Sequence, residues 1–177
     1  MINFTKIIII FCLFASSSYA QDEKVLTKME RFVSNTGKIM KLENYNLPAL
    51  KATYEVVTAK VRKATVQDET NYYLILVKED KYNDKSAAIA EGDLEELIKA
   101  FDELISQSEN ETTNSDYFEN KFTTEDGFQI GYGGAKDIIW FITLEKYGKS
   151  TVLFKSYTDI KVIFGMAHKK IQELKSL

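Results

Sequence analysis

Cysteine, histidine, proline and tryptophan are almost absent from this sequence of 177 residues, which has one of each, at Cys12, His168, Pro48 and Trp140. A single cysteine cannot close a disulfide within the chain. Without a second histidine or cysteine, the nitrogen and sulfur ligands of a zinc site cannot be assembled. We assign His168 to packing or to the surface. We therefore expect a fold that rests on its hydrophobic core, with no metal, no cofactor and no catalytic residue.

An excess of basic residues is also lacking. The chain has 23 Lys and Arg against 26 Asp and Glu, a formal net charge of −3. Nucleic acids and other polyanions are bound by basic surfaces that displace counterions. The charge balance therefore argues against a nucleic-acid partner.

No apolar run reaches the ~20 residues that a membrane-spanning helix requires. Residues 1–20 instead combine Lys6, an apolar core over 7–15 and small residues at Ser18 and Ala20. This pattern is typical of a secretory signal peptide cleaved after Ala20. Cys12 lies inside the apolar core, so we expect no lipid anchor. The sequence predicts an exported protein, periplasmic or extracellular, whose single domain covers 21–177.

What the sequence does contain is one structural plan that occurs twice. The apolar runs 72–77 and 138–144 are rich in aromatic and β-branched residues and have the length of strands. Each is followed by a polar turn, a Lys-Ser pair with a short apolar strand, and a helix whose apolar residues recur at steps of three and four. These stripes consist of Leu94, Leu97, Ile98, Phe101, Leu104 and Ile105 in the first helix, and of Ile160, Ile163, Phe164, Ala167, Ile171 and Leu174 in the second.

The predicted fold class is α+β, with two copies of a unit of three or four antiparallel strands and a helix, preceded by a short N-terminal helix. The boundaries are 22–34 for that helix, 38–106 for copy one, 106–116 for a linker and 117–177 for copy two. Each long helix has one apolar stripe, so we expect it to pack on its own sheet.

Several local signals refine this plan. Asp93 and Glu96 are spaced as a capping box for the first long helix, and Ser156 and Asp159 form a weaker one for the second. Pro48 predicts a turn at 46–49.

In the strand over 52–66, one face carries Val57, Ala59 and Val61 and the other carries Thr58, Lys60 and Arg62. Asp126-Gly127 predicts a hairpin, and Gly131, Gly133 and Gly134 predict a turn with a bulge.

Both central strands carry large apolar side chains on both faces, Tyr72 and Tyr73 in one and Trp140 and Phe141 in the other. One helix covers only one face of a sheet. The second face must be covered by the other sheet, the N-terminal helix, a homodimer mate or a ligand. We favour sheet on sheet. Otherwise Tyr73, Trp140 and Tyr132 are candidates for a recognition surface.

The element order over 51–177 resembles that of PUR-repeat and Whirly-type binders of single-stranded nucleic acid. This resemblance implies a sheet face that holds the strand through Lys60, Arg62 and Tyr72. The motifs NLPxLK at 46–51 and ENKFTTEDGFQIGY at 119–132 also resemble those of a group of small exported bacterial proteins. That second resemblance implies a two-copy domain and no particular activity.

The function we expect is a non-catalytic binding or interaction module whose ligand or partner the sequence does not identify. Two alternatives stay open. One is a hydrolase that uses paired carboxylates, which predicts a cleft where two of them converge and one has a raised pKa. The other is binding of single-stranded nucleic acid or another polyanion. The candidate ligand-binding residues are Tyr72, Tyr73, Tyr132, Trp140, Lys60 and Arg62.

Overall fold

The computed structural model describes residues 26–34, 37–112, 115–135, 137–146 and 150–177. The predicted signal peptide lies outside the described residues. Within them, no helix combines the length and the apolar character needed to cross a membrane.

Two four-stranded antiparallel sheets alternate with two long helices, which confirms the predicted α+β class and the two-copy plan. A short helix, α2, precedes them. In sheet A the strands lie in the order β1-β2-β3-β4, and in sheet B in the order β5-β6-β7-β8. The elements are α2 (Lys28–Val33), β1 (Met40–Lys51), β2 (Val56–Val66), β3 (Glu69–Lys78), β4 (Lys85–Ala90), α3 (Glu91–Ser108), β5 (Phe118–Thr123), β6 (Gln129–Gly134), β7 (Ile139–Thr143), β8 (Thr151–Phe154) and α4 (Thr158–Lys175).

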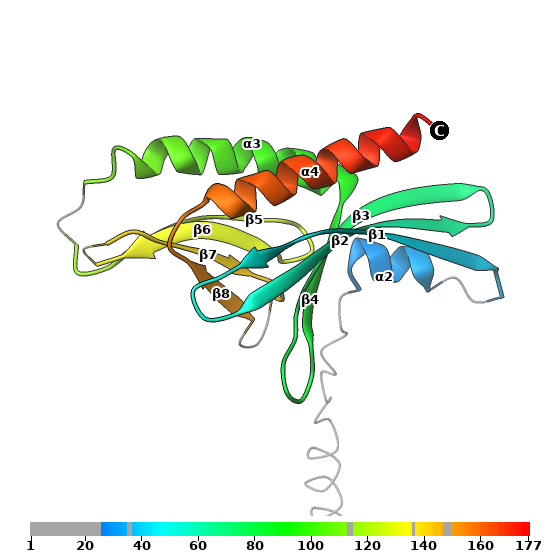
Figure 1. The fold of residues 1–177 in the computed structure, drawn as a ribbon, viewed down its shortest axis with the longest axis horizontal. Helices are drawn as coiled ribbons and strands as arrows, with labels where there is room; N and C mark the ends of the chain where they lie inside the picture. Colours follow the sequence, from blue (N-terminus) through cyan, green and yellow to red (C-terminus); the bar gives the residue numbers. More distant parts are fainter. Residues whose placement is uncertain (1–25, 35–36, 113–114, 136, 147–149) are drawn as a thin grey trace, which may run out of the picture.

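The helices α3 and α4 pack side by side over the sheets (Figure 1). Helix α3 follows sheet A and contacts both β3 and β4 of that sheet and β5 and β6 of sheet B, whereas α4 follows sheet B and lies against β1 and β2 of sheet A. The expectation that each helix packs on its own sheet is therefore wrong for α4, and α3 packs on both sheets. An 18-residue helix is about 27 Å long, but four strands span only about 14 Å, so each stripe reaches beyond one sheet.

One continuous hydrophobic core joins the helices to the inner faces of both sheets. Its aromatic centre is Trp140, whose ring centroid lies 5.5 Å from that of Phe101, 5.0 Å from Tyr132 and 5.3 Å from Tyr157. Trp140 and Tyr132 are both buried. They therefore pack the interior of sheet B.

Helix α2 packs on the outer face of sheet A. The N-terminal helix was one of the four possible covers that the sequence left open. Within the described residues, sheet B, which we favoured as the cover, does not pack on this face. Ala64, Tyr73 and Ile75 are buried there in a small second core, against which Met29 and Phe32 of α2 pack. The N-terminal helix thus shields the apolar residues that β3 presents on its second face.

Two predictions of turns were wrong for physical reasons. Pro48 lies inside β1, at a register shift between Leu47 and Leu50. Proline is tolerated there because β1 is an edge strand and needs no donor on its free side. Gly131 lies within strand β6, where a Cβ would come 2.3 Å from the carbonyl oxygen of Asn120. This glycine permits close strand approach and does not form a turn.

The predicted capping boxes of the two long helices were also wrong. Helix α3 starts one turn earlier, with Ala90 as N-cap and no side-chain cap, because Asp93 bonds to Lys28 instead. Helix α4 starts after Tyr157, also without a side-chain cap.

Candidate functional site

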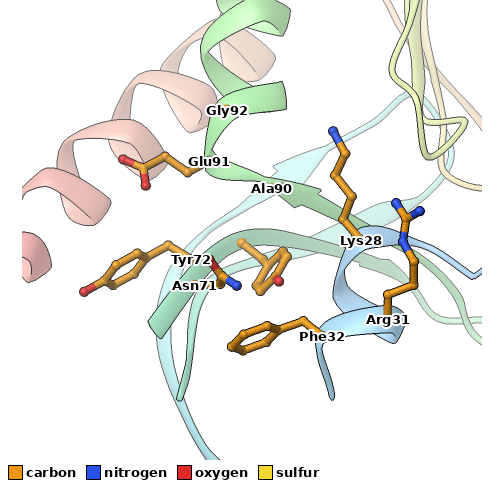
Figure 2. A pocket seen from close by; sticks show the side chains of 9 residues that line it. Lys28, Arg31, Phe32, Asn71, Tyr72, Ala90, Glu91 and Gly92 are labelled. Atoms are coloured by element: carbon orange, nitrogen blue, oxygen red, sulfur yellow. The ribbon is translucent and has the colours of Figure 1, made fainter. Parts of the chain in front are cut away.

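A groove of about 550 Å³ opens between α2, the start of β3 and the junction of β4 with α3; we call it the α2 groove (Figure 2). Helix α2 contributes one wall, and the buried Tyr73 of β3 is among the lining residues. The wall residues from α2 are Lys28, Arg31 and Phe32, those from β3 are Asn71, Tyr72 and Tyr73, and those from the β4–α3 junction are Ala90, Glu91 and Gly92.

Helix α2 begins at a complete capping box. The hydroxyl of Thr27 accepts a hydrogen bond from the N–H of Glu30 at 3.1 Å, and the Glu30 carboxylate accepts one from the N–H of Thr27 at 2.8 Å. A helix of six residues is nevertheless far too short to be stable by itself in water. Its position must be held by contacts with the rest of the fold.

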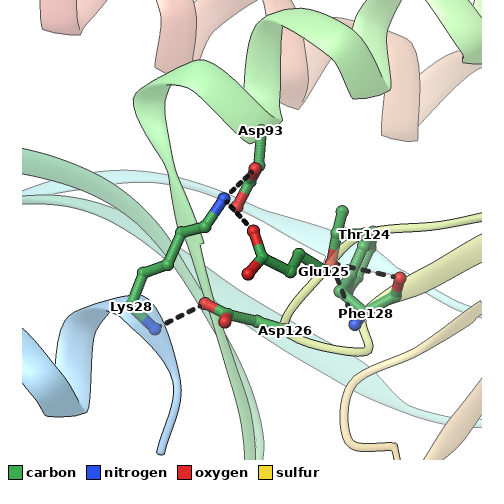
Figure 3. A network of polar contacts seen from close by, with 6 residues as sticks. All are labelled: Lys28, Asp93, Thr124, Glu125, Asp126 and Phe128. Carbon is green, nitrogen blue, oxygen red and sulfur yellow. Dashed lines mark hydrogen bonds and ion pairs between the residues drawn. The ribbon is translucent and has the colours of Figure 1, made fainter.

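Those contacts centre on Lys28, and we call them the Lys28 clamp (Figure 3). The Lys28 Nζ lies 2.6 Å from Asp93 Oδ1 of α3 and 3.0 Å from Glu125 Oε2 in the β5–β6 turn. The backbone N–H of Lys28 donates to Asp126 Oδ2 at 2.9 Å. One residue thus joins α2 to α3 and to sheet B.

In the clamp, two carboxylates contact the Lys28 ammonium group and a third, Asp126, accepts from the Lys28 backbone N–H, so the three carboxyl groups differ in their electrostatics. The hydrogen bond with Asp93 raises the pKa of Lys28, and the Lys28 ammonium lowers the pKa of the Glu125 carboxyl. Burial raises the pKa of Asp126, an effect that the Lys28 N–H opposes and the Asp93 charge reinforces. The clamp therefore carries more negative than positive charge at neutral pH.

The hydrolase alternative predicted two converging carboxylates and one raised pKa, and the clamp has both features. Asp93 and Glu125, however, both contact the Lys28 ammonium, and neither they nor Asp126 line the α2 groove. An ammonium group occupies the place between the carboxylates where a substrate atom would react. This geometry suits the anchoring of a helix better than acid–base chemistry.

The groove itself offers one available cation. The Arg31 guanidinium is exposed and makes no direct ion pair with another residue that the structure describes, although its charge acts to lower the pKa values of the Glu125 and Asp126 carboxyls. The Glu91 carboxylate is partly satisfied, since its Oε1 accepts from Lys175 Nζ at 2.7 Å and from Gln172 Nε2 at 3.1 Å. The Tyr72 hydroxyl donates to the carbonyl oxygen of Leu174 at 3.4 Å.

Of the six residues predicted from sequence, the structure brings only Tyr72 and Tyr73 into the groove. Lys60 and Arg62 lie on the outer face of sheet A, where Arg62 is the cross-strand partner of Tyr73. Arg62 Nε donates to Asn44 Oδ1 at 2.9 Å. The other two predicted residues, Tyr132 and Trp140, lie in the core of sheet B.

The buried Tyr132 hydroxyl is fully partnered. It donates to Glu111 Oε2 at 3.0 Å and accepts from Asn120 Nδ2 at 2.9 Å. Burial raises the pKa of this phenol. The contact ties the segment after α3 to sheet B, which is a packing role.

The groove residues that sequence reasoning missed are Lys28, Arg31, Phe32 and Glu91. The spacing Thr27-x-x-Glu30 would have located the start of α2, but no local signal shows which sheet that helix covers. No family model, curated protein or solved structure matches this chain. In the described residues, no group of three or more His, Cys, Asp or Glu side chains is placed to hold a metal ion.

Proposed function

We propose that this protein is a non-catalytic binding module and that the α2 groove is its ligand site. The observation that carries the proposal is a groove of about 550 Å³ whose lining includes the exposed Arg31 guanidinium and three aromatic side chains, Phe32, Tyr72 and Tyr73. That volume falls within the ~300–1,000 Å³ range of small-molecule sites. Its lining combines aromatic side chains with the charged or polar residues Lys28, Arg31, Asn71 and Glu91, which can orient a ligand.

The chemistry of the walls favours a small ligand with an acidic group on an apolar or aromatic body. Arg31 can hold a carboxylate or phosphate in a bidentate pair. Lys28 cannot serve in the same way, because Asp93 and Glu125 already occupy its ammonium group. Tyr72 is half-buried and leaves part of its surface for an apolar ligand.

We further propose that the module acts outside the cytoplasm. The support is the signal-peptide pattern of residues 1–20, together with a remaining chain that has no cysteine to be oxidised after export.

The test is a titration of the ¹⁵N-labelled protein with a panel of aromatic and aliphatic carboxylates and phosphates. We expect shifts at the amides of Asn71, Tyr73 and Gly92. Arg31→Gln should weaken binding tenfold or more, because a charge-assisted hydrogen bond contributes about 1.5–3 kcal/mol. Lys99→Gln is the control, because it removes one exposed positive charge from α3 at a residue outside the groove. Arg62→Gln tests the outer face of sheet A, where Arg62 Nη1 also lies 3.9 Å from Met29 Sδ of α2.

Two results would contradict the proposal. One is a panel in which no acid shifts the groove amides. The other is a loss of binding in Arg62→Gln but not in Arg31→Gln, which would move the site to the open face of sheet A and favour the polyanion alternative.

A further inference from the structure

Strand β1 forms an edge of sheet A that the rest of the described chain leaves open. It is 12 residues long and pairs only with β2. In the described ranges, no backbone group of another element bonds to its free side. Natural proteins usually keep edge strands short, cover them or pair them, because the free N–H and C=O groups of an edge can bind another strand.

The hydrogen-bonding pattern shows which backbone groups face outward. Val66 and Glu69 close a two-residue hairpin, so the backbone groups of Val66 point to β3. Consistently, the N–H of the next residue, Gln67, donates to the carbonyl oxygen of Ile39 at 3.5 Å. Because bonding alternates along an antiparallel pair, the backbone groups of Met40, Leu42 and Asn44 point away from β2.

Apolar side chains accompany these free groups. Ile39 is 90% exposed, and Met40 and Leu42 are each 41% exposed. They occupy positions 39, 40 and 42, at the start of the strand. The half of β1 nearest its N-terminus is therefore both unpaired and apolar, while Pro48 and the register shift at Leu47/Leu50 interrupt the other half.

We infer that β1 pairs with β1 of a second copy of this chain, antiparallel and about a two-fold axis at Leu42. This register places Leu42 opposite Leu42 of the second copy and Met40 opposite its Asn44, all with outward backbone groups. It also places Lys41 of each copy opposite Glu43 of the other, so that the two-fold axis gives two such pairs. The two A sheets become one sheet of eight strands, and the interface is isologous.

Charge selects this register over its neighbours. A shift of two residues in one direction brings Lys41 opposite Lys41, and in the other direction it brings Glu43 opposite Glu43. Like charges directly opposite are unfavourable in a sheet, whereas opposite charges stabilise it. A parallel in-register arrangement would also align like charges. The Lys41-Leu42-Glu43 sequence is thus self-complementary only in the antiparallel pairing at Leu42.

The apolar residues agree with this arrangement. On the outer face, Leu42 and Met40 of both copies come together as direct and diagonal neighbours. On the inner face, Ile39 lies opposite Tyr45 of the second copy. The pairing therefore covers all three exposed apolar side chains at the start of β1, and it is independent of the α2 groove.

The test measures mass by light scattering with chromatography, using the protein without residues 1–20. We expect a dimer that weakens as salt rises. Glu43→Lys and Lys41→Glu should each weaken the dimer at least tenfold by placing like charges opposite. An equimolar mixture of these two variants should restore it as a heterodimer, because each lysine then meets a glutamate. Lys161→Glu on α4 is the control and should remain a dimer.

A wild-type protein that stays monomeric at millimolar concentration would overturn the inference. So would a dimer that survives both single reversals, or a mixture that yields no heterodimer. Because Glu43 also lies opposite Lys63 of β2, folding of each variant is checked by circular dichroism. If a reversal unfolds the chain, Leu42→Lys provides the second route. It places two lysines on the axis while changing only an exposed side chain, and it should yield a folded monomer.

Discussion

Replacing Lys28 by methionine tests whether the Lys28 clamp holds α2 in place. The substitution keeps most of the length of the side chain and removes its ammonium group. The Asp93 side chain, which is 11% exposed, then loses a hydrogen bond of 2.6 Å and keeps its negative charge near Asp126. A hydrogen bond to a charged group contributes about 1.5–3 kcal/mol. Lys28 is 32% exposed, so solvent screening reduces this to about 1–2 kcal/mol.

For a chain of this size, such a loss lowers the melting temperature by about 2–8 °C. The assay is urea and thermal unfolding, combined with amide hydrogen exchange of α2. The matched control is Lys161→Met, since Lys161 lies 2.8 Å from Asp102 but both side chains are more than half exposed. We expect no measurable change for the control.

The destabilisation by Lys28→Met should also depend on pH. The interaction requires ionised carboxylates, and the pKa of Glu125 is lowered by Lys28. Its contribution is therefore present above the ordinary pKa of a glutamate and is lost as the pH falls through the lowered value. Equal losses for Lys28→Met and Lys161→Met at neutral pH, or a loss for Lys28→Met that is unchanged in acid, would refute the clamp.

Three further predictions follow from burial and close approach. Trp140→Ala should cost about 3–5 kcal/mol in unfolding free energy, because it empties the aromatic centre of the core; a folded variant of unchanged stability would contradict this. Gly131→Ala should destabilise strongly through its 2.3 Å approach to a carbonyl oxygen, whereas Gly165→Ala, with open space in α4, should stabilise by about 0.5–1 kcal/mol; urea unfolding measures both. Asp126→Asn should be at least as stable as the wild type at neutral pH and should flatten the acid side of its stability profile. Burial raises the Asp126 pKa, so the wild type gains stability from this group as the pH falls through the raised value.

Local periodicity was sufficient to predict the order of the elements. The alternation of Val57, Ala59 and Val61 and the stripe from Leu94 to Ile105 describe which face of an element is buried, and the structure buries those faces. An apolar stripe does not indicate which element of the fold packs against it. The packing of α4 on sheet A, and of α3 on both sheets, therefore could not be predicted from it.

The candidate site was predictable only in part, for a related reason. Tyr72 and Tyr73 were selected because β3 carries large side chains on both faces, and both line the groove. The charged wall comes from α2, whose anchor joins Lys28 to Asp126 across 98 positions of sequence. A contact between residues so far apart in the sequence leaves no periodic signal in either segment.

The α2 groove and the β1 edge lie close together on sheet A. Leu42 is in the same cross-strand row as Asn71, a groove residue two strands away. A two-fold axis at Leu42 therefore places two grooves on one face of the eight-stranded sheet. Five strand spacings separate the two copies of Asn71, which is about 24 Å. In that dimer, a ligand with two acidic groups that spans both grooves would gain affinity from the second contact, whereas the small ligand with one acidic group that we propose for the groove would bind each copy separately.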